Sequence, residues 1–241
     1  TEQADYFRRV AQAFPGQPVV VRTFDLGGDK FPAAFEAPLE ANPFLGWRSI
    51  RACLDHPEIF RPQLRAVLRA AVGRDLRIML PLITRVDEVL RVREMVGEER
   101  AALRAAGEPV GERIPIGVMI ETPAAVIIAD RLATVSDFFS VGTNDLTQYT
   151  LCVDRGNARL ADRFRTEDPA ILRQLRTVQQ AASAAGIPVS ICGEMASEPL
   201  SAVLLMGLGF VELSVAPPAL PLLKLIVRSV PKLRKAVRCN S

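Results

Sequence analysis

Two acidic residues follow apolar segments that have the character of buried strands. Glu121 comes directly after the segment 116–120, and Asp145 follows the segment 138–141 after three polar or small residues. Carboxyl ends of parallel strands meet at one edge, so these carboxylates are expected at one rim. Such oxygen ligands suit Mg²⁺, which takes one or two carboxylates and completes its shell with substrate oxygens and water. Helix initiation, with Thr122 as N-cap and Pro123 in the first turn, explains the same segment and is compatible with a metal site.

Three arginines lie near the predicted strand ends. Arg22 closes the segment 19–22, Arg48 follows Gly46-Trp47, and Arg155 lies in the turn-like sequence DRGN. A ligand that carries both phosphate and carboxylate needs forked, permanently charged donors, which arginine supplies. In an arginine-rich chain a single arginine is more often a surface charge, and only the placement near strand ends favours a ligand role.

One cysteine and one histidine complete the candidates for chemistry. Cys192 ends an apolar segment and precedes Gly193, which allows backbone or ligand to approach closely. A strand cysteine is usually an inert small hydrophobe, but a thiol at a rim with arginines and a metal could exchange protons with a substrate. His56, the only histidine, precedes Pro57 and is expected to cap a surface helix. Gly27-Gly28 is expected to form a loop that passes close to another segment.

Short β-branched segments alternate with amphipathic helical segments along the chain, which predicts βαβ units and a parallel sheet buried on both faces. The predicted strands are 19–22, 76–82, 116–120, 138–141, 188–191 and 210–214, and the clearest helices are 57–72, 86–107 and 169–186. Polar residues follow at least four of these strands. Chemistry spread over that many strand ends favours a (β/α)₈ TIM barrel over a doubly wound sheet, which binds ligands only at its switch point.

Length and composition fit one large domain over residues 1–241. Hydrophobic residues make up 49% and charged residues 24%, and the formal net charge is +3. The four cysteines, Cys53, Cys152, Cys192 and Cys239, show no C-x-x-C spacing, so a zinc knuckle and a disulfide scaffold are disfavoured. No apolar run approaches the roughly 20 residues of a membrane span, and basic residues are not interleaved with aromatics. We therefore expect a cytoplasmic protein without membrane insertion or nucleic-acid binding.

Several motifs together resemble the C-terminal domain of enzyme I of the phosphoenolpyruvate-dependent sugar phosphotransferase system. They cover nearly the whole chain in family-like order and spacing. The matching stretches are VRTFDLGGDK (21–30), NPFLGWR (42–48), GVMIETPAA (117–125), FFSVGTNDLTQYT (138–150), VDRGN (153–157) and CGEMA (192–196).

The resemblance implies an α/β fold, a (β/α)₈ TIM barrel of the phosphoenolpyruvate/pyruvate type, that binds Mg²⁺ and forms a homodimer. It assigns Glu121 and Asp145 to the metal, and Cys192 to protonation of the enolate carbon as pyruvate leaves. It also implies that Arg22 and Arg155 act catalytically, since arginines and metal stabilise the transferring phosphoryl charge. The set that would grip phosphate and carboxylate is Arg22, Arg48, Asn144, Asp145 and Arg155.

The family's phosphoacceptor histidine lies on a separate domain, together with the region that docks the carrier protein HPr, and neither is expected in this sequence. The family barrel also opens with an arginine-bearing first strand that this chain is expected to lack. By this interpretation residues 1–241 are a fragment that is part of a phosphotransferase but not competent alone for full transfer. The equivalent domain of pyruvate phosphate dikinase or phosphoenolpyruvate synthase, a fused or nitrogen-regulatory paralogue, and a non-catalytic binding module remain alternatives.

Overall fold

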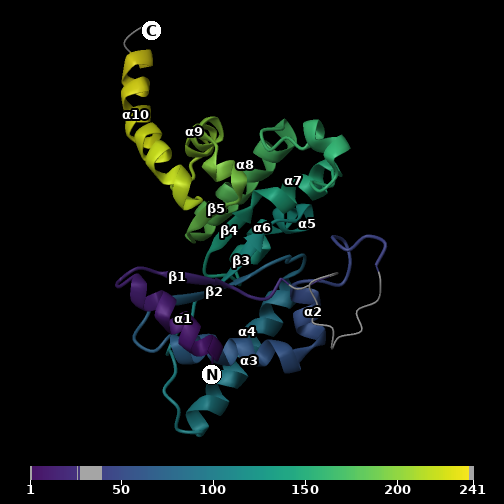
Figure 1. Ribbon diagram of the computed structural model, residues 1–241, viewed down its shortest axis with the longest axis vertical. Helices are drawn as coiled ribbons and strands as arrows, with labels where there is room; N and C mark the ends of the chain where they lie inside the picture. The colour runs from purple at the N-terminus through teal and green to yellow at the C-terminus, as the bar shows by residue number, and fades with distance from the viewer. Residues whose placement is uncertain (1, 26, 28–39, 239–241) are drawn as a thin grey trace. The chain divides into compact units, whose positions relative to one another are not determined.

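A computed structural model of the chain describes residues 2–25, 27 and 40–238, and the side chains of 231–238 are not part of that description. Helices and strands alternate through these residues as the sequence predicts (Figure 1). All six predicted strands are present: β1 (Val19–Arg22), β2 (Leu76–Leu80), β3 (Ile116–Ile120), β4 (Phe139–Gly142), β5 (Val189–Cys192) and β6 (Glu212–Ser214). The pairs β1–β2, β2–β3, β4–β5 and β5–β6 are all parallel.

The chain divides into two compact units. Unit 1 comprises residues 1–119 and 134–138, and unit 2 comprises residues 120–133 and 139–241. The boundary falls at the end of β3, whose last residue, Ile120, belongs to unit 2. Each unit is described separately below.

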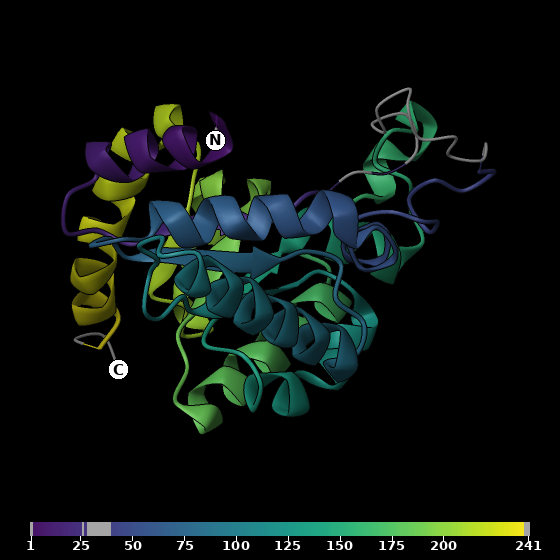
Figure 2. The ribbon, with the colours of Figure 1, turned by 90° about the horizontal axis from the view of Figure 1, so that it is seen from below.

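Unit 1 contains the strands β1 to β3, and its helix α3 contacts β2. Val19 pairs with Leu76 and Ile78 pairs with Ile116, so the three strands run parallel in consecutive order. The helices are α1 (Glu2–Ala13), α2 (Ile50–Asp55), α3 (Pro57–Ala70) and α4 (Val86–Ala105). Two of them, α1 and α3, lie side by side in both ribbon views (Figures 1 and 2).

The amphipathic helix α3 supplies much of the core of unit 1. Its residues Phe60, Leu64 and Leu68 recur every four positions, so they share one helix face, and each is fully buried. Burial of three such side chains stabilises the unit by about 1.5–3 kcal/mol each.

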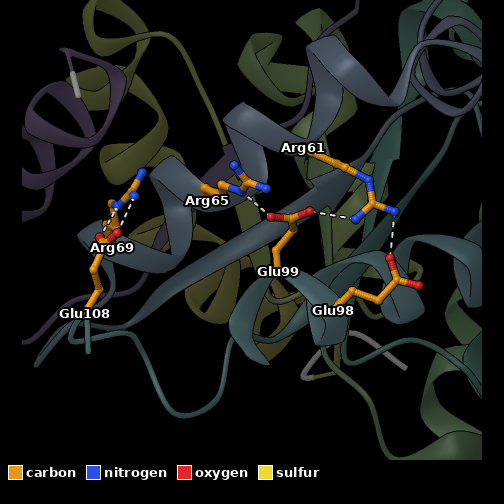
Figure 3. Close-up of polar contacts among 6 residues, drawn as sticks. All are labelled: Arg61, Arg65, Arg69, Glu98, Glu99 and Glu108. Carbon is orange, nitrogen blue, oxygen red and sulfur yellow. Dashed lines mark hydrogen bonds and ion pairs between the residues drawn. The ribbon is translucent and has the colours of Figure 1, made fainter. Parts of the chain in front are cut away.

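The partly exposed face of α3 is joined to α4 and the chain after it by ion pairs (Figure 3). Arg61 donates to Glu98 and to Glu99, both at 2.6 Å, and Arg65 donates to the other oxygen of Glu99. One turn further along α3, Arg69 makes a forked contact with both carboxylate oxygens of Glu108, at 2.6 and 2.7 Å. Burial alone would raise the pKa of Glu99, but hydrogen bonds from Arg65 and Arg61 lower it overall.

Unit 2 contains strands β4 to β6, again parallel and in consecutive order. Its helices are α5 (Pro123–Ile127), α6 (Ala129–Ala133), α7 (Thr143–Leu151), α8 (Pro169–Ala185), α9 (Pro199–Gly207) and α10 (Leu220–Arg238). The start of α8 is set by Asp168, whose side chain accepts from the Ala170 amide at 2.8 Å, and by Pro169 at the first helical position. Its end is set by Gly186, which takes the left-handed conformation with φ 68°.

The expectation of strands buried on both faces holds in the middle of the order and fails at its ends. Every residue of β3 and of β4 is buried. Residues of β1 and β6, the first and last strands in the order, are partly or fully exposed, apart from Val21. The reason is position, because an outer strand is covered less than a central one. No helix within the described residues is both long and apolar enough to cross a membrane.

Candidate functional site

Two of the predicted arginines, Arg22 and Arg48, lie in unit 1 and converge on one carboxylate that follows β1. Arg48 Nη2 donates to both oxygens of Asp25, at 2.9 and 3.0 Å. Arg22, the last residue of β1, places its Nη1 3.7 Å from Asp25 Oδ2. Arg22, Asp25 and Arg48 are called the Asp25 cluster below, and they carry two positive charges against one negative charge.

Burial and charge act in opposite directions on the acid of the Asp25 cluster. Burial would raise the pKa of Asp25, but the hydrogen bond and charge of Arg48, with the charge of Arg22, lower it overall. Beside it, burial raises the pKa of the Cys53 thiol to about 12, with a smaller contribution from the charge of Asp25. Asp25 is therefore an anion that orients the arginines, and Cys53 is a neutral thiol whose Sγ lies 3.6 Å from the Phe24 carbonyl oxygen.

The backbone of Gly27 lies close to Arg48 and fixes the position of the Arg48 Cβ. Gly27 and Arg48 form an isolated antiparallel bridge, and a Cβ at Gly27 would lie 2.1 Å from Arg48 Cβ. Glycine is therefore required here, and the prediction that the Gly27 loop passes close to another segment is confirmed. The next residue, Ser49, takes φ 59°, a strained conformation for a residue other than glycine. Residues 28–30 of the same motif lie outside the described residues.

In unit 2, Glu121 directly follows β3 and is only 5% exposed. The predicted helix start is confirmed directly behind it. The Thr122 hydroxyl accepts from the Ala125 amide at 3.1 Å, and Pro123 is the first residue of α5. The hydroxyl of Thr122 therefore provides the cap at the start of α5.

Asp145 lies in the first turn of α7, directly after β4, and it is buried. Arg155 Nη1 lies 3.1 Å from its Oδ1, although residues 145 and 155 are separated by most of α7 and a loop. That loop returns because the Arg155 amide donates to the side-chain oxygen of Gln148 at 3.1 Å. The structure thus joins a predicted metal ligand to a predicted anion-binding arginine.

Cys192, the last residue of β5, accepts the last hydrogen bond of a short chain that begins at two serine hydroxyls. Ser190 Oγ donates to Ser140 Oγ at 3.2 Å, and Ser140 Oγ donates to Cys192 Sγ at 3.0 Å. The geometry follows from the parallel register, in which Ser140 pairs with Ser190 and Gly142 with Cys192. A donor pointing at sulfur favours the thiolate over the thiol, and this is the property that a proton-exchanging cysteine needs.

The loop after Cys192 packs tightly against the start of α7. Gly193 has φ 138°, and a Cβ there would lie 2.3 Å from Thr143 Oγ1. The Glu194 amide donates to the side-chain oxygen of Asn144 at 3.2 Å. Asn144 is therefore tied to the loop that carries Cys192.

A divalent metal would have to rely on Glu121 and Asp145. The described residues hold no group of three or more His, Cys, Asp or Glu side chains that could bind a metal. Mg²⁺ needs only one or two protein carboxylates, and the fully buried Thr143 hydroxyl, which has no hydrogen-bond partner in unit 2, is a third oxygen at the start of α7. The oxygen atoms of Glu121, Asp145 and Thr143 are of the kind that Mg²⁺ accepts as ligands.

Sequence reasoning missed the partners of the candidate residues. Asp25 was visible as an acid after β1, but its role in holding Arg48 depends on contact across a sequence separation of 23 residues. Ser140 and Ser190 occupy apolar strands, where each could have been an ordinary core hydroxyl. The parallel register between β4 and β5 was the available signal.

His56 lies at the predicted helix start, but its side chain makes no capping hydrogen bond and instead places Nδ1 2.7 Å from Glu58 Oε1. The helix α3 does begin with Pro57, so the predicted boundary is correct. Cys239 lies outside the described residues.

Comparison with protein families gives one match that covers almost the whole chain. Residues 1–231 match the family described as PEP-utilising enzyme, PEP-binding domain. Phosphoenolpyruvate-protein phosphotransferase of Staphylococcus carnosus (strain TM300) is 44% identical over 229 residues, which cover 95% of this chain and 40% of that protein. The proteins of the same name from Listeria monocytogenes serovar 1/2a and Bacillus subtilis (strain 168) are 46% and 45% identical over 215 residues, or 89% of this chain and 38% of theirs. The chain thus spans about two fifths of the length of these relatives.

Solved structures add a likeness in fold. A citrate lyase from Burkholderia xenovorans LB400 is 19% identical, with a TM-score of 0.56 over 94% of this chain and 64% of that one. An HpcH/HpaI aldolase/citrate lyase family protein from Burkholderia cenocepacia J2315 is 14% identical, with a TM-score of 0.51 over 96% of this chain and 90% of that one. These similarities support the α/β fold with parallel strands.

Proposed function

The chain belongs to the family of PEP-binding domains of PEP-utilising enzymes, and from this premise we propose that it binds phosphoenolpyruvate as part of a phosphoenolpyruvate-protein phosphotransferase. One observation carries the proposal. Most predicted site residues end a strand or begin the segment that follows one, after β1, β3, β4 and β5, and Arg48 and Arg155 lie further along the chain. In α/β folds with parallel strands, ligands bind at that edge.

The arginines are proposed to bind the phosphate and carboxylate groups of the substrate. Arg48 and Arg22 already lie against an anion, Asp25, so the Asp25 cluster is arranged to meet negative charge. In unit 2, Arg155 is held beside Asp145, and Asn144 is held by the Glu194 amide. Fixed guanidinium groups stabilise the charge on a transferring phosphoryl group without reorganising during the reaction.

Glu121 and Asp145 are proposed to hold Mg²⁺. When bound, Mg²⁺ would neutralise charge on the phosphoryl oxygens of the substrate. The role of the two carboxylates is to offer oriented oxygen ligands, and their burial directly before α5 and in the first turn of α7 provides the orientation.

Cys192 is proposed to deliver the proton that completes the reaction. The P–O bond of phosphoenolpyruvate breaks, the phosphoryl group forms a bond to a histidine nitrogen on another domain, and the enolate of pyruvate remains. The enolate carbon then takes the proton from the Cys192 thiol, which leaves pyruvate and a thiolate that solvent reprotonates. Ser140 supports this step because its hydroxyl donates to Cys192 Sγ and stabilises that thiolate.

The remaining parts of the proposal are carried over from the family resemblance. They are closure of the parallel strands into a (β/α)₈ barrel, a homodimer, passage of the phosphoryl group to an HPr-type carrier for sugar uptake, and a cytoplasmic location. The name that the 44–46% identical relatives share supports the transfer of a phosphoryl group to a protein.

The proton step can be separated from binding by a variant of Cys192. In a protein that carries this chain together with the phosphoacceptor domain, Cys192→Ala should lower pyruvate formation by about 10²–10⁴-fold, since general acid–base groups contribute that much. Phosphoenolpyruvate affinity, measured by calorimetry, should stay within a few-fold, because the lost interaction belongs to the transition state. Cys152→Ala, at an exposed cysteine at the end of α7, is the matched control and should change neither quantity. Turnover near the normal rate in Cys192→Ala would refute the role of Cys192.

A further inference from the structure

A cavity of about 160 Å³ lies in unit 1, beside α4 and the amino-terminal end of β3. Four residues of α4 line it, Arg93, Val96, Gly97 and Arg100, at spacings of three, four and seven that place them on one helix face. The opposite wall comes from the segment 113–116 and from Asp137. The volume is well above the roughly 10–15 Å³ that a single water molecule requires.

The charges around this cavity do not balance. Asp137 is the only acidic residue in the lining, and its oxygens already accept from Arg93 Nη2 at 2.7 Å, from Arg113 Nη2 at 3.1 Å and from the Ile116 amide at 2.8 Å. Arg100 is a third guanidinium group, and it forms no ion pair with a described residue. The lining therefore carries an excess of two positive charges.

Arg100 also has a buried donor without an acceptor. Its Nε is shielded from solvent and has no hydrogen-bond partner among the described residues. Burial lowers the pKa of Arg100, and the charge of Arg104 lowers it further. Leaving a buried charged donor unpaired is costly, so the surroundings of Arg100 are arranged for an acceptor that the protein itself does not supply.

A glycine lines the cavity at a helix position that does not require one. Gly97 lies in the interior of α4, where glycine destabilises a helix by about 0.5–1 kcal/mol relative to alanine. Its backbone does not require glycine, because its φ is not positive and a Cβ there would meet no atom within 4 Å. Gly97 is exposed and lines the opening of the pocket, so a larger side chain there would narrow the entrance.

From these observations we propose that unit 1 carries a binding site for a small tetrahedral oxyanion of the size of inorganic phosphate, held by Arg100 with support from Arg93 and Arg113. Guanidinium groups bind such oxyanions through forked, charge-assisted hydrogen bonds. The site is distinct from the one that Glu121 helps to form. The cavity lies at the amino-terminal end of β3 and Glu121 follows its carboxyl end, about 16 Å along a strand of five residues.

Nuclear magnetic resonance of this chain, titrated with inorganic phosphate at constant ionic strength, tests the proposal. The amide of Gly97 and the Nε–H of Arg100 are the reporters, so phosphate bound elsewhere does not contribute to the signal. We expect saturable shifts at both positions with phosphate and with sulfate, and much weaker shifts with acetate. Shifts that do not saturate, or that are equally strong with acetate, would overturn the proposal.

Three variants assign the binding to the cavity. Arg100→Gln should weaken phosphate binding at least about tenfold, since it removes a charge-assisted contact. Arg104→Gln removes the same charge from an exposed position one turn away and should have little effect. Gly97→Leu should narrow the opening of the cavity and weaken binding several-fold, with the rest of the spectrum preserved. Equal losses in Arg100→Gln and Arg104→Gln, or full affinity in a folded Gly97→Leu protein, would contradict the assignment. If Gly97→Leu does not fold, the comparison of the two arginine variants decides.

Discussion

Replacing Glu99 by glutamine should destabilise unit 1 through the contact between α3 and α4 (Figure 3). The Glu99 side chain is 3% exposed and accepts from both Arg61 and Arg65. A hydrogen bond to a charged group contributes about 1.5–3 kcal/mol, but the side chains of Arg61 and Arg65 are 27% and 44% exposed, so solvent screens part of this energy. We expect Glu99→Gln to lower the free energy of unfolding by about 2 kcal/mol.

The adjacent residue provides a matched control for this prediction. Glu98 accepts from Arg61 at 2.6 Å, but its side chain is 44% exposed, so Glu98→Gln should cost less than about 1 kcal/mol. Urea unfolding followed by circular dichroism measures both variants. The corresponding fall in Tm for Glu99→Gln is about 4–8 °C for a chain of this size. Equal losses in the two variants would show that burial of the carboxylate does not govern its contribution.

Two further predictions follow from the contacts of individual groups. Arg65 and Arg61 lower the pKa of Glu99 below its ordinary value near 4.5, so the ionic contribution of Glu99 to stability should be complete above pH 4.5 and be lost as pH falls through the lowered pKa. The difference in unfolding free energy between the wild type and Glu99→Gln should therefore shrink over that pH range. A constant difference would contradict the assignment. Ser140→Ala should slow the alkylation of Cys192 by iodoacetamide at neutral pH several-fold, because the substitution removes the hydrogen-bond donor to Cys192 Sγ. Mass spectrometry of the modified peptide measures the rate, and an unchanged rate would show that Ser140 does not stabilise the thiolate.

The sequence was sufficient to predict the elements that position the site. Apolar segments flanked by polar residues identified all six strands, since β-branched runs and their boundaries are local features of the chain. The cap at Thr122 and the start of α3 at Pro57 were predicted for the same reason. The predicted strand 76–82 ends at Leu80 in the structure, where the chain turns and Leu82 takes a positive φ of 54°.

The sequence was not sufficient to predict what each functional side chain touches. Asp25 meets Arg48 through the Gly27 bridge, and Ser140 meets Cys192 through the register of β4 with β5. Both contacts depend on how distant segments come together, and no local pattern encodes that. The exposure of β1 and β6 depends likewise on their position in the strand order.

Calorimetry of phosphoenolpyruvate binding to this chain, with and without Mg²⁺, tests the central claim most directly. The account predicts that Mg²⁺ strengthens binding, that Glu121→Ala and Asp145→Ala each remove this gain, and that Asp130→Asn, at an exposed carboxylate on α6, leaves it intact. No binding of phosphoenolpyruvate, or undiminished Mg²⁺ dependence in both Glu121→Ala and Asp145→Ala, would contradict it.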